Sequence, residues 1–184
     1  MTYRSLAKET IKVLEVLLKQ NDLPIRIRQI ASLINKTSTK NKIIAIFGNG
    51  GSASDAEHFV GELVCSYKNK KRKSFKALAL TTNSSIISAW SNDFSFDGIF
   101  SRQIESLNET LGFALGLSTS GNSANVINGL KKANELGIAT CLICGSKHKE
   151  ISFVDFVIKV PSTNTAIVQT ITQVIYHSIC EELE

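Results

Sequence analysis

A histidine and a glutamate stand four residues apart in the first half of this sequence, as His58 and Glu62. Residues four apart share one face of an α-helix, so an imidazole and a carboxylate would be presented together. Such a pair can serve as acid and base in proton transfer, or as two ligands of a metal ion. The elements that position the pair, and the polar groups that accompany it, decide between these uses.

The predicted helix that carries this pair follows a loop that is poor in side chains. An apolar run at 43–47 predicts a buried strand, which ends at the loop Gly48-Asn49-Gly50-Gly51-Ser52. We expect Ser52 or Ser54 to cap the helix and Asp55 to lie in its first turn. A helix N-terminus behind such a loop offers unpaired N–H groups and a positive dipole to an anion. Gly-rich turns of this kind also occur in many α/β proteins without that use.

A second loop carries more hydrogen-bonding groups than a turn requires. It lies between a predicted strand and a predicted helix and reads Ser118-Thr119-Ser120-Gly121-Asn122-Ser123. One hydroxyl is enough to cap a helix, whereas here several hydroxyls, an amide and a helix N-terminus come together. Neutral donors suit a phosphate group that must be released as well as bound. Both loops follow strands at their carboxyl ends, where open α/β sheets bind ligands, so we expect them to face one cleft.

Two further polar segments are less informative on their own. Asn92-Asp93, between two predicted helices, is typical of a turn and a cap. The last predicted helix, 164–183, is mostly apolar but carries Gln169, Gln173 and His177, and a lone histidine in such a helix is usually a core or interface residue. Gln169 and His177 are eight residues apart, about 12 Å along a helix axis, so only long side chains could reach one common atom.

Strands and helices alternate after residue 42. Apolar runs predict strands at 43–47, 77–80, 113–117, 139–144 and 155–160. Helical patterns lie between most of them, at 54–67, 85–91, 96–107 and 123–136. The crossovers suit right-handed βαβ units, so we predict a three-layer αβα sandwich around a five-stranded parallel sheet. Two helices, 6–18 and 25–34, precede the sheet, and their apolar stripes need a partner in this chain or in a neighbouring subunit.

Composition narrows the class of protein. The chain has 184 residues, of which 43% are hydrophobic and 20% charged, as expected for one globular domain. No apolar run approaches the ~20 residues of a membrane span, and the first ten residues lack a signal-peptide core. We therefore expect a cytoplasmic protein with no membrane partner. The basic run Lys68–Lys73 is typical of a solvated loop, and because few aromatic residues flank it we expect no nucleic-acid partner.

The cysteines do not predict a metal site. Cys141 and Cys144 form a CxxC, but they lie in a predicted strand, where side chains three residues apart point to opposite faces. A cytoplasmic protein keeps its thiols reduced, and we expect this for all four, the other two being Cys65 and Cys180.

Taken together, the polar segments resemble one family. GNGGSASDAEHF followed by ELV, SNDFSFDGIFSRQ, LGLSTSGNSANVI and the pair Gln169 and His177 are similar to segments of the phosphoheptose isomerases, of the SIS (sugar isomerase) domain superfamily. The resemblance covers nearly the whole chain, and the order and spacing of the segments make it specific. It implies one SIS domain over residues 1–184, of the flavodoxin-like type, with N-terminal helices (1–36) in oligomer contacts.

The family interconverts D-sedoheptulose 7-phosphate and D-glycero-D-manno-heptose 7-phosphate for the heptoses of lipopolysaccharide, capsule or other surface glycans. The resemblance thus implies a homotetrameric aldose–ketose isomerase that works through an enediol. Glu62 would be the catalytic base and His177 the catalytic acid. The zinc ligands implied are His58, Glu62, Gln169 and His177. The phosphate would be held by Ser118, Thr119, Ser120 and Ser123, and the rest of the substrate would lie near Asn49, Gly50, Gly51, Ser52, Glu62, Asn92, Asp93 and Gln169.

These residue types suit the reaction. Moving a proton between adjacent carbons needs a base at the carbon acid and a donor or metal at the carbonyl oxygen. No organic cofactor is required, and the first loop is not a dinucleotide-binding GxGxxG. Zinc bound to Glu62 would lower its basicity, so either the metal moves or the free carboxylate oxygen takes the proton; both remain open.

Some positions depart from the family pattern. Charged residues common in the family are replaced here by Ser66, Ala166, Ile167 and Thr170. This leaves room for another phosphorylated sugar, or for a non-catalytic SIS protein such as the relatives that bind the replication initiator as a scaffold. The retained His58, Glu62, Gln169 and His177 favour the enzyme, because a scaffold does not need them.

Overall fold

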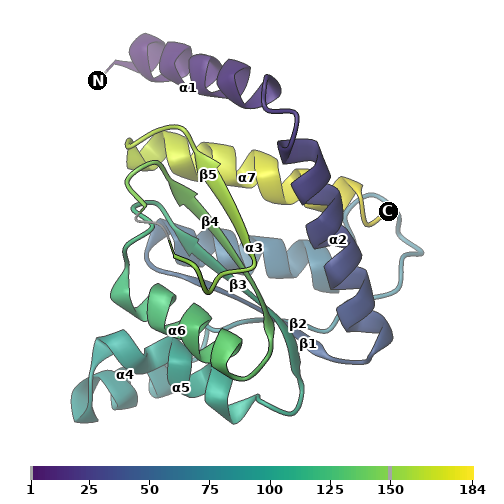
Figure 1. Ribbon diagram of the computed structural model, residues 1–184, viewed down its shortest axis with the longest axis vertical. Helices are drawn as coiled ribbons and strands as arrows, with labels where there is room; N and C mark the ends of the chain where they lie inside the picture. The colour runs from purple at the N-terminus through teal and green to yellow at the C-terminus, as the bar shows by residue number, and fades with distance from the viewer. Residues whose placement is uncertain (1, 149–150) are drawn as a thin grey trace.

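Five parallel strands form the centre of the protein, as predicted (Figure 1). The computed structural model describes residues 2–148 and 151–184. The strands are β1 (Ile43–Gly48), β2 (Ala77–Ala79), β3 (Leu111–Ser118), β4 (Ala139–Gly145) and β5 (Phe156–Val160). Their order in the sheet is β2-β1-β3-β4-β5, the flavodoxin-like order. The strands are nearly continuous apolar runs because helices cover both faces of the sheet.

The helices form two layers that enclose two separate hydrophobic clusters (Figure 1). On one face lie α1 (Tyr3–Leu18), α2 (Leu23–Thr39), α3 (Gly51–Val64) and α7 (Thr165–Glu181). On the other face lie α4 (Ser84–Asp93), the 3-10 turn η1 (Phe96–Gly98), α5 (Ile99–Ser106) and α6 (Ala124–Glu135). This arrangement confirms the predicted three-layer αβα sandwich.

The first helix is only partly covered by the rest of the chain. Helix α1 packs against α7 at the edge of the molecule (Figure 1) and buries Val13 and Leu17. Leu18 is 84% exposed and Ile11 is 55% exposed on the same helix. The apolar face of α1 is therefore only partly buried against the rest of its own chain.

The start of α3 differs from the prediction. Neither Ser52 nor Ser54 caps the helix, which begins at Gly51 with Gly50 as its N-cap and without a side-chain cap. Gly50 adopts φ +55°, a conformation that residues with a Cβ rarely adopt, and this lets the chain turn directly from β1 into the helix. Asp55 consequently lies beyond the first turn, where it is buried.

The other boundaries move by a few residues. Helix α3 ends at Val64 rather than at Tyr67, so the predicted last turn belongs to the following loop. Gly137 adopts φ +69° after α6, as predicted for a glycine at a helix C-terminus.

The CxxC cysteines point to opposite faces of the sheet, as predicted. Cys141 belongs to the cluster beneath α3 and α7, and Cys144 belongs to the cluster beneath α5 and α6. All four cysteines are free thiols, and only Cys65 is exposed. Burial raises the pKa of the Cys144 thiol to about 12. Within the described part of the chain, no helix has the length and apolar character needed to cross a membrane.

Candidate active site

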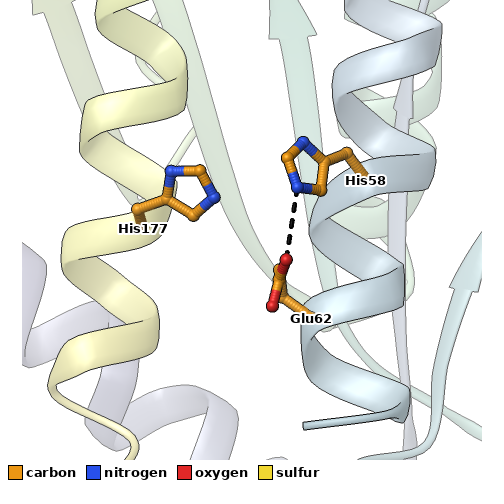
Figure 2. Close-up of side chains that lie close together, drawn as sticks. All are labelled: His58, Glu62 and His177. Carbon is orange, nitrogen blue, oxygen red and sulfur yellow. Dashed lines mark hydrogen bonds and ion pairs between the residues drawn. The ribbon is translucent and has the colours of Figure 1, made fainter. Parts of the chain in front are cut away.

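Two imidazoles and a carboxylate converge between α3 and α7. His58 and Glu62 lie one turn apart on α3, and His177 projects toward them from α7 (Figure 2). One ligand atom from each of the three side chains lies within 4.8 Å of the others. Nε2 of His58 is 3.2 Å from Oε1 of Glu62, and the side chain of Glu62 is 23% exposed. The three groups are close enough to share one small ligand, and a reactant could reach them from solvent.

A buried tyrosine holds His58 from behind. The hydroxyl of Tyr176 lies 2.8 Å from Nδ1 of His58, and its ring stacks on Phe59 with centroids 5.1 Å apart. Burial, with smaller effects from neighbouring carboxylates, raises the pKa of the Tyr176 hydroxyl, so it stays protonated and can donate to Nδ1. With Nδ1 accepting in this way, a neutral His58 carries its own proton on Nε2, facing Glu62; were Nε2 to bind a metal, the proton would lie on Nδ1 and be donated to the hydroxyl oxygen of Tyr176 instead. Tyr176 was not predicted, because an aromatic residue in an apolar helix is usually a core residue.

About one turn before His58 and His177, toward the N-termini of α3 and α7, an acid on one helix pairs with an amide on the other. Nε2 of Gln173 donates to Oδ1 of Asp55 at 3.1 Å, and Asp55 is only 5% exposed. Burial raises the pKa of the Asp55 carboxyl above its ordinary value, although the hydrogen bond from Gln173 and the charge of His58 act in the opposite direction. The sequence singles out Gln173 without a partner, because Asp55 lies 118 positions away and only the packing of α3 against α7 joins the two.

One turn further toward the N-terminus of both helices, Gln169 lies against Gly51. A Cβ atom added to Gly51 would lie 2.1 Å from Nε2 of Gln169, so the amide fills the space that the glycine leaves. The resemblance places substrate near Gly51, and within this chain the space beside that glycine is filled by the side chain of Gln169. His58 is seven residues further along α3, about 10 Å along the helix axis. Within one chain, Gln169 therefore does not lie with the other three predicted zinc ligands.

These contacts reveal that α3 and α7 run parallel and in step. The pairs are Gly51 with Gln169, Asp55 with Gln173, and His58 with Tyr176. Each pair is separated by 118 positions in the sequence. These paired residues of α3 and α7 form one continuous row, which we call the seam. The seam runs from the glycine loop to Glu62.

The serine loop forms the predicted cluster of hydroxyls at the start of α6. Oγ of Ser118 lies 3.0 Å from Oγ of Ser123 and 3.5 Å from Oγ of Ser120. The same oxygen accepts a hydrogen bond from the backbone N–H of Gly121 at 3.1 Å. Thr119 is half-buried beside them, and its carbonyl accepts from the N–H of Gly145. The cluster has the donors that a phosphate needs and contains no charged side chain.

The glycine loop lies beside the start of α6 and the end of β3, on either side of the serine loop in the sequence. The amides of Asn49 and Asn125 exchange two hydrogen bonds, of 2.8 and 2.9 Å, and so join the first loop to the first turn of α6. A Cβ atom on Gly48 would lie 2.8 Å from the carbonyl of Leu117, which shows how closely the strand ends approach. Ser52, in the first turn of α3, is buried beside this junction, and its N–H donates to the carbonyl of Asn49 at 3.0 Å.

Asn92 and Asp93 lie elsewhere in the chain. They end α4, on the face of the sheet opposite to α3 and α7, and both are exposed. Nδ2 of Asn92 donates to Oδ1 of Asp93 at 2.8 Å. A single chain therefore does not bring these two residues to the histidines.

The positions that depart from the family pattern have ordinary local roles. Ile167 is fully buried in the core between α7 and the sheet. Thr170 is exposed, and its hydroxyl donates to the carbonyl of Ala166 at 3.0 Å. Ser66 is half-buried in the loop after α3.

Comparison with known proteins defines first the class and then the family. The sequence model of the SIS domain matches residues 6–145. A probable phosphoheptose isomerase from Thermoplasma acidophilum is 42% identical over 167 residues, spanning 88% of this chain and 91% of that protein. The phosphoheptose isomerase of Helicobacter pylori is 35% identical over 100% of this chain and 91% of its own length. The solved phosphoheptose isomerase from Francisella tularensis superposes with a TM-score of 0.88, at 26% identity, over 100% of this chain and 98% of that one. The chain belongs to the phosphoheptose isomerase family, as its motifs predicted.

Proposed function

We propose that the protein is an aldose–ketose isomerase that converts D-sedoheptulose 7-phosphate to D-glycero-D-manno-heptose 7-phosphate. The observation that carries the proposal is the meeting of Glu62, His58 and His177 within 4.8 Å on two facing helices. The relatives named phosphoheptose isomerase, which match nearly the whole chain, support the substrate class.

In this proposal Glu62 and His177 move the protons of the reaction. The Glu62 carboxylate removes a proton from C1 of the ketose, while His177 gives a proton to the oxygen on C2, and an enediol results. Glu62 then returns the proton to C2 and His177 takes the proton of the hydroxyl on C1, which leaves the aldose. Tyr176 keeps the ring of His58 turned toward Glu62 through the bond to Nδ1.

We propose that zinc binds at His58, Glu62 and His177, through one ligand atom of each, so that the second oxygen of Glu62 and the second ring nitrogen of His177 are left for proton transfer. Two imidazoles and a carboxylate form a donor set that suits zinc, and three protein ligands leave a position open for a reactant. A bound metal would polarise the carbonyl and stabilise negative charge on its oxygen. Gln169 lies too far along α7 to join them from its place in this chain, so in our proposal it contacts substrate or completes the set from a second copy.

The phosphate is proposed to bind at Ser118, Thr119, Ser120 and Ser123, with Asn49 and the glycine loop beside the sugar chain. The hydroxyl cluster at the N-terminus of α6 supports this, because backbone N–H groups and neutral donors can cradle the dianion. Asn92 and Asp93 would approach the substrate of a neighbouring subunit, since they project from the opposite face of their own chain.

We also propose a cytoplasmic homotetramer whose product enters heptose synthesis for surface glycans such as lipopolysaccharide or capsule. The exposed apolar residues of α1 support contacts between subunits through the N-terminal helices. Helix α4 supports contacts between subunits in the same way, because none of its residues is buried although it carries the large apolar side chains of Ile86 and Trp90.

The direct test follows aldose formation from sedoheptulose 7-phosphate with wild-type protein and Glu62→Gln. Loss of a general base is expected to lower turnover by about 10²- to 10⁴-fold. Glu57→Gln is the matched control on the same helix, because Glu57 accepts from Thr81 and stands apart from the three groups. Incubation with a zinc chelator is expected to abolish turnover, and added zinc to restore it. Near-normal turnover of Glu62→Gln would refute the assignment of the base.

A non-catalytic scaffold, the alternative left open by the sequence, has no use for a carboxylate and two imidazoles held together. The turnover assay separates the two: inactivity of wild-type protein toward every ketose phosphate, with capture of a protein partner, would favour the scaffold.

A further inference from the structure

The loop between α3 and β2 is more than a solvated basic segment. Lys70, Lys71 and Lys73 are exposed, as expected for such a run, but the side chain of Arg72 is only 8% exposed. It folds back over the ring of Phe75, with the guanidinium 4.7 Å from the ring centroid. A long charged side chain withdrawn from solvent needs acceptors for its donors.

The acceptors of Arg72 are the last carbonyls of α3. Nη2 donates to the carbonyl of Glu62 at 2.6 Å, and Nη1 donates to that of Leu63 at 3.2 Å. The last helical bond of α3 runs from the N–H of Cys65 to the carbonyl of Gly61, so the carbonyls of Glu62 and Leu63 have no partner within the helix. The carbonyl of Leu63 also accepts from the backbone N–H of Phe75 at 3.2 Å, whereas the carbonyl of Glu62 is bonded by Arg72. A positive charge at the C-terminal end of a helix also interacts favourably with the helix dipole. Arg72 thus closes the helix turn that carries Glu62.

Arg72 is in turn fixed by Glu184, which follows α7. Its Nε donates to Oε1 of Glu184 at 3.1 Å, and the side chain of Glu184 is only 14% exposed. The backbone N–H of Asn69 donates to the other oxygen of the same carboxylate. Because both side chains are largely withdrawn from water, removal of one partner would leave the other charge unpaired in a place where water cannot fully solvate it.

The same loop also reaches the helix turn that carries His177. The ring of Tyr67 stacks on the imidazole of His177, with centroids 5.7 Å apart and planes inclined by 20°. The Tyr67 hydroxyl donates to Glu181 at 3.2 Å, and Lys68 forms an ion pair with Glu181. The loop therefore contacts both helices at the level where their reactive side chains face each other.

We propose that Arg72 is a positioning residue for the isomerase reaction: by capping the last turn of α3 and anchoring it to Glu184, it holds Glu62 in place opposite His177. This inference rests on the proposed function, in which Glu62 is the base. Arg72 itself contacts backbone carbonyls, the ring of Phe75 and Glu184, none of which is a reacting group, so it acts through the helix. Lysine cannot replace it fully, because one ammonium cannot span acceptors set around a planar fork.

The place of Arg72 predicts which kinetic constant it controls. It lies at the C-terminal end of α3, whereas the serine loop packs near the N-terminal end. Loosening the last turn should misplace Glu62 and leave the phosphate contacts intact. We expect Arg72→Met, which keeps the aliphatic stem over Phe75, to lower kcat by about 10- to 100-fold with KM little changed.

The experiment measures kcat and KM of Arg72→Met, Arg72→Lys and Glu184→Gln, at a temperature where circular dichroism shows each variant folded. Arg72→Lys and Glu184→Gln should lose less turnover than Arg72→Met. Arg102→Met is the control, because Arg102 also lies over an aromatic ring and pairs with a glutamate, but on the opposite face of the sheet. Amide hydrogen exchange at residues 62–66 should become about tenfold faster in Arg72→Met, since a hydrogen bond from a charged donor is lost. Guanidinium ion added to Arg72→Ala should restore part of the turnover.

Wild-type kcat in Arg72→Met would overturn the inference, and so would a loss of kcat with unchanged exchange at residues 62–66. Should Arg72→Met not fold, the same outcomes apply to Glu184→Gln and Arg72→Lys. Absence of turnover in the wild-type protein would instead overturn the proposed function, and exchange would still decide whether Arg72 caps α3.

Discussion

Gly51→Ala provides a sharp test of the seam between α3 and α7. The new Cβ would lie 2.1 Å from Nε2 and 2.9 Å from Cδ of Gln169, where ordinary contact begins at 3.4 Å. The amide must therefore retreat by at least about 1.3 Å, or the helices must part. Gln169 is a flexible side chain and Gly51 has a helical backbone, so we expect the amide to move while the protein stays folded.

The cost should appear in activity rather than in stability. Alanine is a better helix former than glycine by about 1 kcal/mol in a helix interior, and the part of this gain that applies at the first residue of α3 opposes the cost of rearranging one side chain. If Gln169 contacts the substrate, a displacement of this size should lower kcat/KM by about 10- to 100-fold. The assay is aldose formation from the ketose phosphate, together with thermal unfolding followed by circular dichroism.

Two comparisons make this result specific. Gly61→Ala lies on the same helix, where an added Cβ meets nothing within 4 Å, so it should stabilise the protein by about 0.5–1 kcal/mol and leave turnover unchanged. In a Gln169→Ala background, Gly51→Ala should have no further effect, because the atom that it displaces is absent. Unchanged kcat/KM in Gly51→Ala, or an equal loss in both backgrounds, would refute the reasoning.

Two other predictions concern the burial of a carboxyl group and the exposure of a thiol. Because the pKa of Asp55 is raised in the folded protein, the native state binds this proton more tightly than the unfolded chain does, and stability is lost as the pH rises above the ordinary value of 3.8. Asp55→Asn should therefore raise the unfolding temperature near pH 7, and the difference should shrink below about pH 4; an equal difference at both pH values would contradict this. Iodoacetamide should label Cys65 rapidly in the native protein, as measured by mass spectrometry, because it is the exposed thiol. Fast labelling of a buried thiol would contradict the structure, since those thiols are shielded in Cys141, Cys144 and Cys180.

The architecture followed from patterns that burial imposes on sequence. A sheet covered on both faces requires apolar runs such as 43–47 and 139–144, and the helices between them show their own period. The loop hydroxyls of Ser118 and Ser123 could be placed because they follow a predicted strand, and strand ends position ligands in such folds.

Features that depend on tertiary contacts were not predictable in the same way. The start of α3 was misplaced because Gly50 turns the chain through a positive φ, which leaves Ser52 without a capping role. The burial of Arg72 depends on Glu184, more than a hundred positions away, and nothing in a run of basic residues distinguishes the one that folds inward. Gln169 is the residue type that the family has at this position, but its contact with Gly51 depends on how α3 and α7 pack.

The constant offset of 118 positions between paired residues of α3 and α7 has a consequence for how this gene can change. Loops between the two helices can lengthen or shorten without disturbing the seam, because each helix keeps its own spacing. One residue inserted into α3 between Gly51 and Glu62 would rotate every later side chain by about 100° and break each later pair at once. We therefore expect insertions and deletions in the loops, whereas α3 and α7 should keep a fixed number of residues in any active descendant.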